Sequence, residues 1–198
     1  MSLRLFVALE PPDPVRRRLA AAQEGLRSAS GRHADEIRWV APDRMHLTLQ
    51  FLGAVPEEQL DAVRVALAGA AAAGCPLRLE VRGAGGFPSA RRPRAVWCGV
   101  AGDLERLQAL VIGLGLALGP LGFPASLRTF APHFTLGRSR DGRGVSGLGE
   151  AIDAVAGAGA ASWRADEVVL FRSLPAPGGS RYEPLLRAPL GCPGEGPG

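Results

Sequence analysis

The chain contains no lysine, and its charge is therefore carried differently from that of most proteins. All 23 basic residues are arginine, against 19 acidic residues, and the formal net charge is +4. Arginine presents a permanently charged planar fork that binds phosphate through paired hydrogen bonds. A GC-rich coding sequence also favours arginine, together with alanine, glycine and proline. The composition is therefore compatible with an anionic substrate but does not establish one.

Cysteines are few, and long apolar runs are missing. Cys75, Cys98 and Cys192 lie far apart, and no CxxC pair or His/Cys metal spacing occurs. Neither a disulfide framework nor a zinc site is indicated, so we expect reduced thiols in a cytoplasmic protein. No run of 18 or more apolar residues occurs, which argues against a membrane span. The Pro11-Pro12 pair comes too early for a signal-peptide core.

Histidine is also scarce, yet two of the three histidines begin the same pattern. HLTL from His46 and HFTL from His133 share the order His-apolar-Thr-Leu and lie 133 − 46 = 87 residues apart. In a β-strand, side chains alternate between faces, so each histidine shares a face with its threonine. In the first motif this alternation places Gln50 on the histidine's face and Phe51 on the apolar face. We expect each strand to pack on a core and present an imidazole and a hydroxyl to a cleft.

Both halves of the chain show the same order of predicted elements. Hydrophobic patterning predicts strand, helix, His-Thr strand, helix and strand in each half, separated by a loop at Gly83 to Pro93. The predicted fold is α+β and bilobal. Two lobes related by an approximate twofold axis, roughly 1–85 and 94–190, have antiparallel sheets that flank a central cleft, with helices outside. The chain is free to cross between the lobes, and the Pro/Gly-rich residues 191–198 are predicted to be a disordered tail.

Two imidazoles that face each other across a cleft are suited to acid–base catalysis of a displacement. One accepts a proton from the nucleophile while the other donates a proton to the leaving group. The threonines add hydrogen-bond donors for phosphoryl oxygens, as in the layout of metal-free ribonucleases. A single His-x-Thr strand is commonplace and usually structural. Two copies in matching places of a duplicated pattern favour a functional site.

The two motifs resemble the signature segments of the two-histidine phosphoesterase superfamily. HLTLQFLG and PHFTLGR carry this likeness. The chain is most similar to the branch of bacterial and archaeal RNA 2′,3′-cyclic phosphodiesterases, also named 2′-5′ RNA ligases. RLFVALEPP near the N-terminus, the segment from Gly86 to Trp97 and SLPAPGGSRYEPLL from Ser173 extend the likeness over nearly all of residues 1–190.

The resemblance implies an enzyme that opens RNA 2′,3′-cyclic phosphate ends to 2′-phosphomonoesters. It implies that His46 donates a proton to the leaving O3′ and that His133 accepts one from water. Thr48 and Thr135 then hold the non-bridging oxygens. We expect no metal or cofactor, a monomer, no membrane association, and RNA or a nucleotide with a 2′,3′-cyclic phosphate as partner.

Three other functions remain to be compared with hydrolysis. Reversible 2′-5′ RNA ligation would use the same histidines. A nucleotide or RNA-end-binding protein that keeps the cleft without turnover is the non-enzymatic alternative, and the intact motifs argue against it. A metal-dependent hydrolase is the weakest alternative because the chain has no suitable ligand cluster.

Residues outside the two tetrapeptides are also candidates for the site. Arg138 is a candidate for phosphate binding, although alternation puts it on the face opposite His133 unless the strand bends at Gly137. A solvated arginine is the alternative. Aromatic side chains near the motifs are candidates for stacking a nucleobase, with core packing as the alternative: Trp39, Phe51, Phe87 and Phe130.

Overall fold

The computed structural model describes residues 1–124, 130–157, 159–177 and 179–192. Strands and helices alternate along the chain, with short 3₁₀ helices (η) between them. In chain order the elements are β1 (Ser2–Leu9), α1 (Asp13–Ala29), η1 (Gly31–Glu36), β2 (Ile37–Trp39), η2 (Pro42–Arg44), β3 (Leu47–Pro56), η3 (Glu57–Gln59), α2 (Leu60–Ala73), β4 (Leu77–Phe87), β5 (Ala95–Gly102), α3 (Leu104–Leu118), η4 (Gly119–Leu121), β6 (His133–Ser139), α4 (Gly149–Ala156), β7 (Ala161–Ala165), β8 (Glu167–Ala176) and β9 (Gly179–Pro189).

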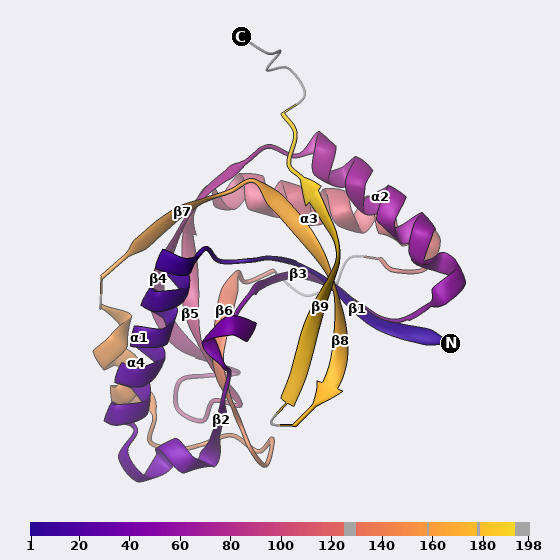
Figure 1. Cartoon of the computed structure of the whole chain (residues 1–198). Helices are drawn as coiled ribbons and strands as arrows, with labels where there is room; N and C mark the ends of the chain where they lie inside the picture. The colour runs from indigo at the N-terminus through magenta and orange to yellow at the C-terminus, as the bar shows by residue number, and fades with distance from the viewer. Residues whose placement is uncertain (125–129, 158, 178, 193–198) are drawn as a thin grey trace.

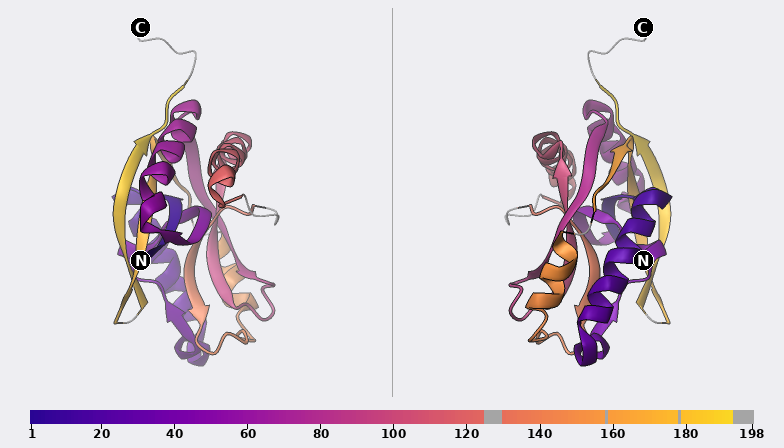
Figure 2. Two further views of the ribbon diagram at one scale, coloured as in Figure 1. Left: turned by 90° about the vertical axis from the view of Figure 1, so that its right-hand side faces the viewer. Right: turned by 90° about the vertical axis from the view of Figure 1, so that its left-hand side faces the viewer.

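The strands form one antiparallel sheet with two similar halves. Its order is β7-β4-β5-β6-β3-β1-β8-β9, and the short β2 pairs with β6. The two His-Thr strands, β3 and β6, are neighbours at the centre and are joined by a single residue pair. The β8–β9 hairpin and the β4–β5 strands lie on opposite sides of this seam (Figures 1 and 2). The predicted α+β class with an antiparallel sheet is confirmed.

The helices cover one side of the curved sheet and leave the other side to the site. α1 and α4 pack together against β4, β6 and β7, while α2 and α3 pack together against β3, β8 and β9 (Figure 1). In α1 the buried residues Val15, Leu19, Ala22 and Leu26 recur every three or four positions. This spacing places them on one helix face, which buries apolar surface against the sheet.

The chain crosses between the two halves of the sheet more than once. Within residues 1–87, β1 and β3 belong to one half, whereas β2 and β4 belong to the other. The loop predicted from Gly83 is wrong up to Phe87, because β4 continues to that residue. The Trp97 ring packs where a side chain at Gly85 would lie. A glycine that marks a turn in the sequence thus allows a close approach between two strands.

The C-terminal end of the described chain is held by a disulfide between Cys75 and Cys192. The Gly191 N–H also donates a hydrogen bond to the Ala71 carbonyl at 3.1 Å. The expectation of reduced thiols is therefore wrong for these two cysteines, whereas Cys98 is free and buried. The fold brings together residues 117 positions apart. The predicted disordered tail is wrong at residues 191–192, and its remainder, 193–198, lies outside the described residues.

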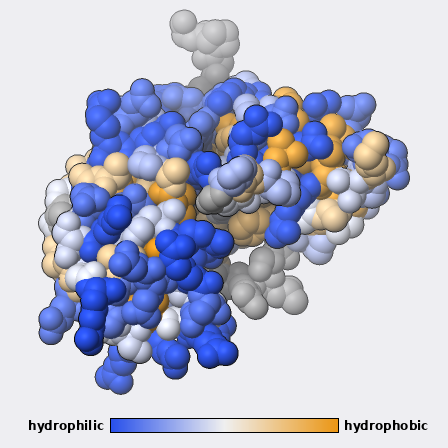
Figure 3. All heavy atoms as spheres, turned by 60° about the horizontal axis from the view of Figure 1, so that its bottom comes forward, coloured by the Kyte–Doolittle hydropathy of each residue, from blue (hydrophilic) through white to orange (hydrophobic). Residues whose placement is uncertain are grey.

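One helical stretch, Leu104–Leu121, is long and apolar enough to span a membrane by length and composition alone. Core helices of other proteins meet the same test. Here Leu107, Leu114 and Leu118 are completely buried and belong to the hydrophobic core. Much of the face in Figure 3 is hydrophilic, with hydrophobic residues gathered toward its upper right. The core packing of α3 accounts for much of its apolar composition.

Candidate active site

The centre of the site is the seam between β3 and β6. Leu47 on β3 lies directly opposite Phe134 on β6, and neither side chain is exposed to solvent. These two residues anchor the middle of both motifs in the core. Because side chains alternate along a strand, the residues on either side of each anchor face away from the core.

The antiparallel register crosses the two motifs over each other. If this register is continued by one step in each direction, His46 comes opposite Thr135 and Thr48 comes opposite His133. Directly opposed residues carry their side chains on the same face, about 4.5–5.5 Å apart at Cβ. Each histidine thus has the threonine of the other motif as its cross-strand neighbour. The register therefore places two imidazoles and two hydroxyls on the same face of the seam.

The β3 strand carries a β-bulge three residues after its histidine. Against β1, Thr48 pairs with Ala8 and Gln50 pairs with Val7, which leaves Leu49 without a partner. A bulge inserts one residue and reverses the alternation of faces beyond it.

The β6 strand carries a bulge at the matching place. Against β5, Thr135 pairs with Trp97 and Gly137 pairs with Val96, which leaves Leu136 without a partner. The two motifs therefore share a backbone irregularity as well as a sequence pattern. The inserted residue is the leucine that ends each tetrapeptide.

The paired bulges turn the residue five positions after each histidine toward the site. On β3 this residue is Phe51, which is 71% exposed, and on β6 it is Arg138. The predicted faces of Phe51 and Gln50 are therefore wrong. Gln50 is buried, and its amide donates a hydrogen bond to the Phe123 carbonyl at 2.8 Å. Arg138 was predicted to share the face of His133 only if the strand bends at Gly137. The bulge at Leu136, next to Gly137, supplies this change of face.

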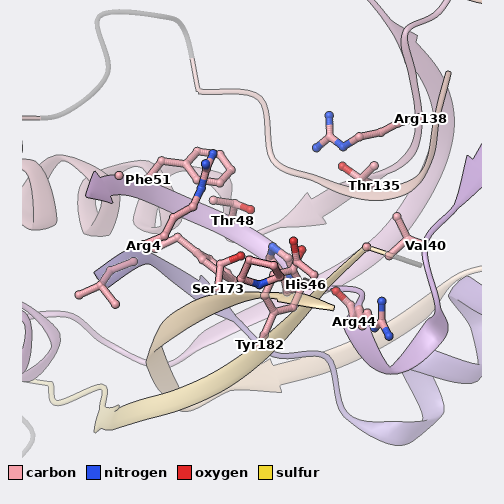
Figure 4. A pocket seen from close by; sticks show the side chains of 16 residues that line it. Arg4, Val40, Arg44, His46, Thr48, Phe51, Thr135, Arg138, Ser173 and Tyr182 are labelled. Carbon is pink, nitrogen blue, oxygen red and sulfur yellow. Dashed lines mark hydrogen bonds between the residues drawn. The ribbon is translucent and has the colours of Figure 1, made fainter. Parts of the chain in front are cut away.

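A cavity of about 540 Å³ opens beside the seam, and its described lining includes His46, Thr48 and Thr135 but not His133. In Figure 4, Thr135 and Arg138 lie together on one side of the cavity. Thr48, Phe51 and His46 lie across from them. Its lining includes arginines and hydroxyl groups but no described Asp or Glu. Within the described ranges, no three His, Cys, Asp or Glu side chains are grouped to hold a metal ion. The cavity is therefore suited to an anion.

His46 is held by its backbone and by aromatic rings. Its Nδ1 lies 2.8 Å from the Arg44 carbonyl oxygen. A carbonyl only accepts, so Nδ1 carries the proton in the neutral ring and Nε2 is left for chemistry. The Phe6 ring lies 4.7 Å from the imidazole, and Tyr182 packs edge-on at 5.0 Å. These contacts fix both the tautomer and the plane of the ring.

His133 is held in the same way by different residues. Its Nδ1 lies 2.7 Å from the Ala131 carbonyl oxygen, which again leaves Nε2 unused. The Phe87 ring packs edge-on at 4.9 Å, and the Trp97 ring lies 6.2 Å away. Each histidine therefore donates to the carbonyl two residues before it. The third histidine, His33, is elsewhere, with Nδ1 2.7 Å from Glu36 Oε1 in η1.

Burial and nearby positive charge make both imidazoles less basic. Burial is the main cause that lowers the pKa of His46; the Arg44 carbonyl opposes it, and the charges of Arg138 and His133 add to it. Burial likewise lowers the pKa of His133, opposed by the Ala131 carbonyl and reinforced by Arg138. Both shifts favour the neutral imidazole in the free site. A bound phosphate anion would favour protonation of both rings again.

Of the four predicted stacking residues, Trp39 and Phe51 lie in different surroundings. The Trp39 indole N–H donates to the Ala34 carbonyl at 3.1 Å, and its ring packs against the core beside Gly137. It is not part of the cavity lining, whereas Phe51 is. Phe130 also packs against the core.

Several lining residues were not recognised from the sequence. They are Arg4, Arg44, Ser173, Ser180 and Tyr182, and they come from β1, η2 and the β8–β9 hairpin. Tyr182 is the only tyrosine of the chain, and this rarity could have marked it as a candidate site residue from the sequence. The others are common residue types in ordinary strands and loops. Their place in the site depends on the pairing of β1 with β8 and of β8 with β9.

Solved structures share this fold. The chain resembles Escherichia coli LigT complexed with 3′-AMP, with a TM-score of 0.74 and 27% identity, over 96% of this chain and 99% of that one. It also resembles a protein of Thermus thermophilus, with a TM-score of 0.77 and 27% identity over the same shares.

The family model of LigT-like phosphoesterases matches residues 9–97 and 100–182. The chain therefore belongs to the LigT-like phosphoesterase family, and the predicted resemblance is confirmed. The RNA 2′,3′-cyclic phosphodiesterase of Methanothermobacter thermautotrophicus is 31% identical over 182 residues, 92% of this chain and 96% of that protein. That of Thermus thermophilus is 36% identical over 145 residues, 70% of this chain and 69% of that protein.

Proposed function

We propose that this protein is a metal-independent RNA 2′,3′-cyclic phosphodiesterase that releases 2′-phosphomonoesters. The observation that carries the proposal is the antiparallel register that crosses the two His-x-Thr motifs at the β3–β6 seam. The cavity beside the seam includes His46, Thr48 and Thr135 in its described lining and no acidic residue. The names of the relatives support the choice of a cyclic phosphodiester as substrate.

In the proposed reaction, the phosphate of the cyclic ester lies between the two free Nε2 atoms. The neutral Nε2 of His133 accepts a proton from water as the water oxygen forms a bond to phosphorus. The bond from phosphorus to O3′ breaks, and the protonated Nε2 of His46 donates its proton to O3′. The product keeps its phosphate on O2′. The assignment of acid and base follows the family resemblance, because both imidazoles are held in the same way.

The remaining groups bind and orient the substrate in this proposal. The hydroxyls of Thr48 and Thr135 donate hydrogen bonds to the non-bridging oxygens. Arg138 supplies positive charge, which stabilises the extra charge that develops on these oxygens in the transition state. Phe51 presents an exposed ring in the lining, on which a nucleobase can stack. Arg138 and Phe51 have equivalent places in the two motifs but different chemistry. They therefore make the two sides of the site different, so that the substrate binds in one orientation.

Ligation is the second reaction that this site supports. If an RNA 5′-hydroxyl replaces water as nucleophile, the same proton transfers open the cyclic phosphate and form a 2′-5′ linkage. A protein that binds RNA ends without turnover is the alternative of another class.

The test measures turnover of adenosine 2′,3′-cyclic phosphate by protein treated with EDTA. We expect 2′-AMP as the product, and loss of about 10²–10⁴-fold in kcat for His46→Ala and for His133→Ala. His33→Ala is the matched control and should keep wild-type activity. Binding without turnover would support the binding-protein alternative. Activity that requires added Zn²⁺ or Mn²⁺ would show that the proposed mechanism is wrong.

A further inference from the structure

A row of polar side chains crosses the sheet next to the histidines. On β8, Ser173 pairs with Tyr182 of β9, and Arg172 pairs with Leu5 of β1, so one further step places Ser173 beside Arg4. Side chains that oppose one another across strands share a face. Arg4, Ser173 and Tyr182 all line the cavity. They form a continuous row of one guanidinium and two hydroxyls.

An aromatic row runs beside this polar row. Phe6 on β1 pairs with Phe51 of β3 and with Phe171 of β8, and its ring lies 6.2 Å and 5.3 Å from theirs. Phe6 and Phe171 are buried, while Phe51 is 71% exposed. The row therefore ends in the open ring of Phe51, which lines the cavity next to the buried ring of Phe6.

Arg4 has no counter-ion on the described part of the protein. It is an exposed residue, and no Asp or Glu among the described residues lies within ion-pair distance of it. Arg172, one strand away, is paired with Glu183 at 4.0 Å. The described lining of the cavity contains no acidic side chain either. A guanidinium in such surroundings is available to an anionic group of a ligand.

Arg4 lies too far along β1 to serve the phosphate at the histidines. Thr48 is opposite Ala8, four residues beyond Arg4, and four residues of strand span about 13 Å. Figure 4 shows the Arg4 side chain beside Phe51, across the cavity from Arg138. The two arginines are therefore placed for two separate anionic groups with the open ring of Phe51 between them.

We propose that Arg4, assisted by Ser173 and Tyr182, forms a second phosphate subsite. It binds the 5′-phosphate of the same nucleoside whose 2′,3′-cyclic phosphate lies at the histidines, while the base stacks on Phe51. The inference rests on the proposed function. The 5′-phosphate is either the last internal linkage of an RNA strand or the monoester of a 5′-phosphorylated mononucleotide. In both cases the site recognises a nucleoside that carries phosphate at both ends.

The test compares three substrates that differ only at the 5′ position. Adenosine 2′,3′-cyclic phosphate has no 5′-phosphate, its 5′-phosphorylated form has a monoester, and the dinucleotide ApA with a 2′,3′-cyclic end has an internal linkage. We expect kcat/KM of the wild type to be about tenfold higher for the second and third substrates, as one charge-assisted contact produces. A larger gain for the dinucleotide would identify an RNA strand as the ligand, and a larger gain for the monoester would identify a mononucleotide.

Arg4→Gln should reduce this ratio to about one, and Ser173→Ala should reduce it partly. Arg17→Gln, which removes an exposed charge on α1 away from the cavity, should keep the ratio. Because the contact is partly exposed, raising the salt concentration should also reduce the ratio in the wild type. An equal rate on all three substrates, or an unchanged ratio in Arg4→Gln, would overturn the subsite while leaving the proposed function intact. No turnover of any of the substrates would instead reject the proposed function.

Discussion

Arg138 should act on this site in two separable ways, through the phosphate and through the imidazoles. The change to test is Arg138→Gln. A hydrogen bond to a charged group contributes about 1.5–3 kcal/mol, which corresponds to about 10–150-fold in kcat/KM. Because the Arg138 side chain is exposed, we expect the lower end of this range, about tenfold.

The second effect of Arg138→Gln is on the pH dependence. The guanidinium lowers the pKa of both His46 and His133, because a nearby positive charge disfavours the protonated imidazole. Its removal should raise both pKa values. Protonation of the base and deprotonation of the acid then both occur at higher pH, so both limbs of the bell-shaped kcat/KM profile should move upward.

The assay for both effects is steady-state hydrolysis of adenosine 2′,3′-cyclic phosphate across the pH range at low salt. Arg38→Gln is the matched control, since Arg38 lies directly opposite Arg138 on β2 and is not part of the cavity lining. It removes the same charge one strand farther from the histidines. If both limbs stay in place in Arg138→Gln, the electrostatic argument is refuted. If kcat/KM does not fall, Arg138 does not bind the phosphate.

The proton roles, the stacking ring and the disulfide can each be tested in the same way. On a p-nitrophenyl phosphodiester, whose leaving group needs no proton, His46→Ala should recover much of its kcat while His133→Ala stays impaired; rescue of His133→Ala instead would reverse their roles. Phe51→Ala should raise KM about tenfold, because one stacked base contributes about 1–3 kcal/mol, and Phe51→Trp should not raise it. Equal KM values for the wild type and Phe51→Ala would exclude stacking. Reduction of the Cys75–Cys192 disulfide should lower the free energy of unfolding by up to about 5 kcal/mol, measured by denaturation with and without reductant. In Cys192→Ser, which cannot form the disulfide, the reductant should leave the free energy of unfolding unchanged.

The sequence by itself determined the class of fold and which residues form the proposed catalytic centre. The repeated His-x-Thr pattern is local, and the apolar residues between the polar ones anchor each strand in the core, as Leu47 and Phe134 do. Alternation then leaves each histidine and threonine on the opposite face. These consequences need no knowledge of the partner strand, so they could be predicted.

Only the tertiary structure decided the faces of Phe51 and Arg138 and the pairing of Cys75 with Cys192. Strict alternation put Phe51 in the core and Gln50 in the site, and both positions were wrong because a bulge intervenes. A bulge is a mismatch in length between two paired strands, so it is set by the register with β1 or β5 and not by β3 or β6 alone. The disulfide joins residues 117 positions apart, and the Arg4 row crosses three strands. Such contacts form between segments that lie far apart in the sequence. Local sequence patterns do not indicate which of these segments pair.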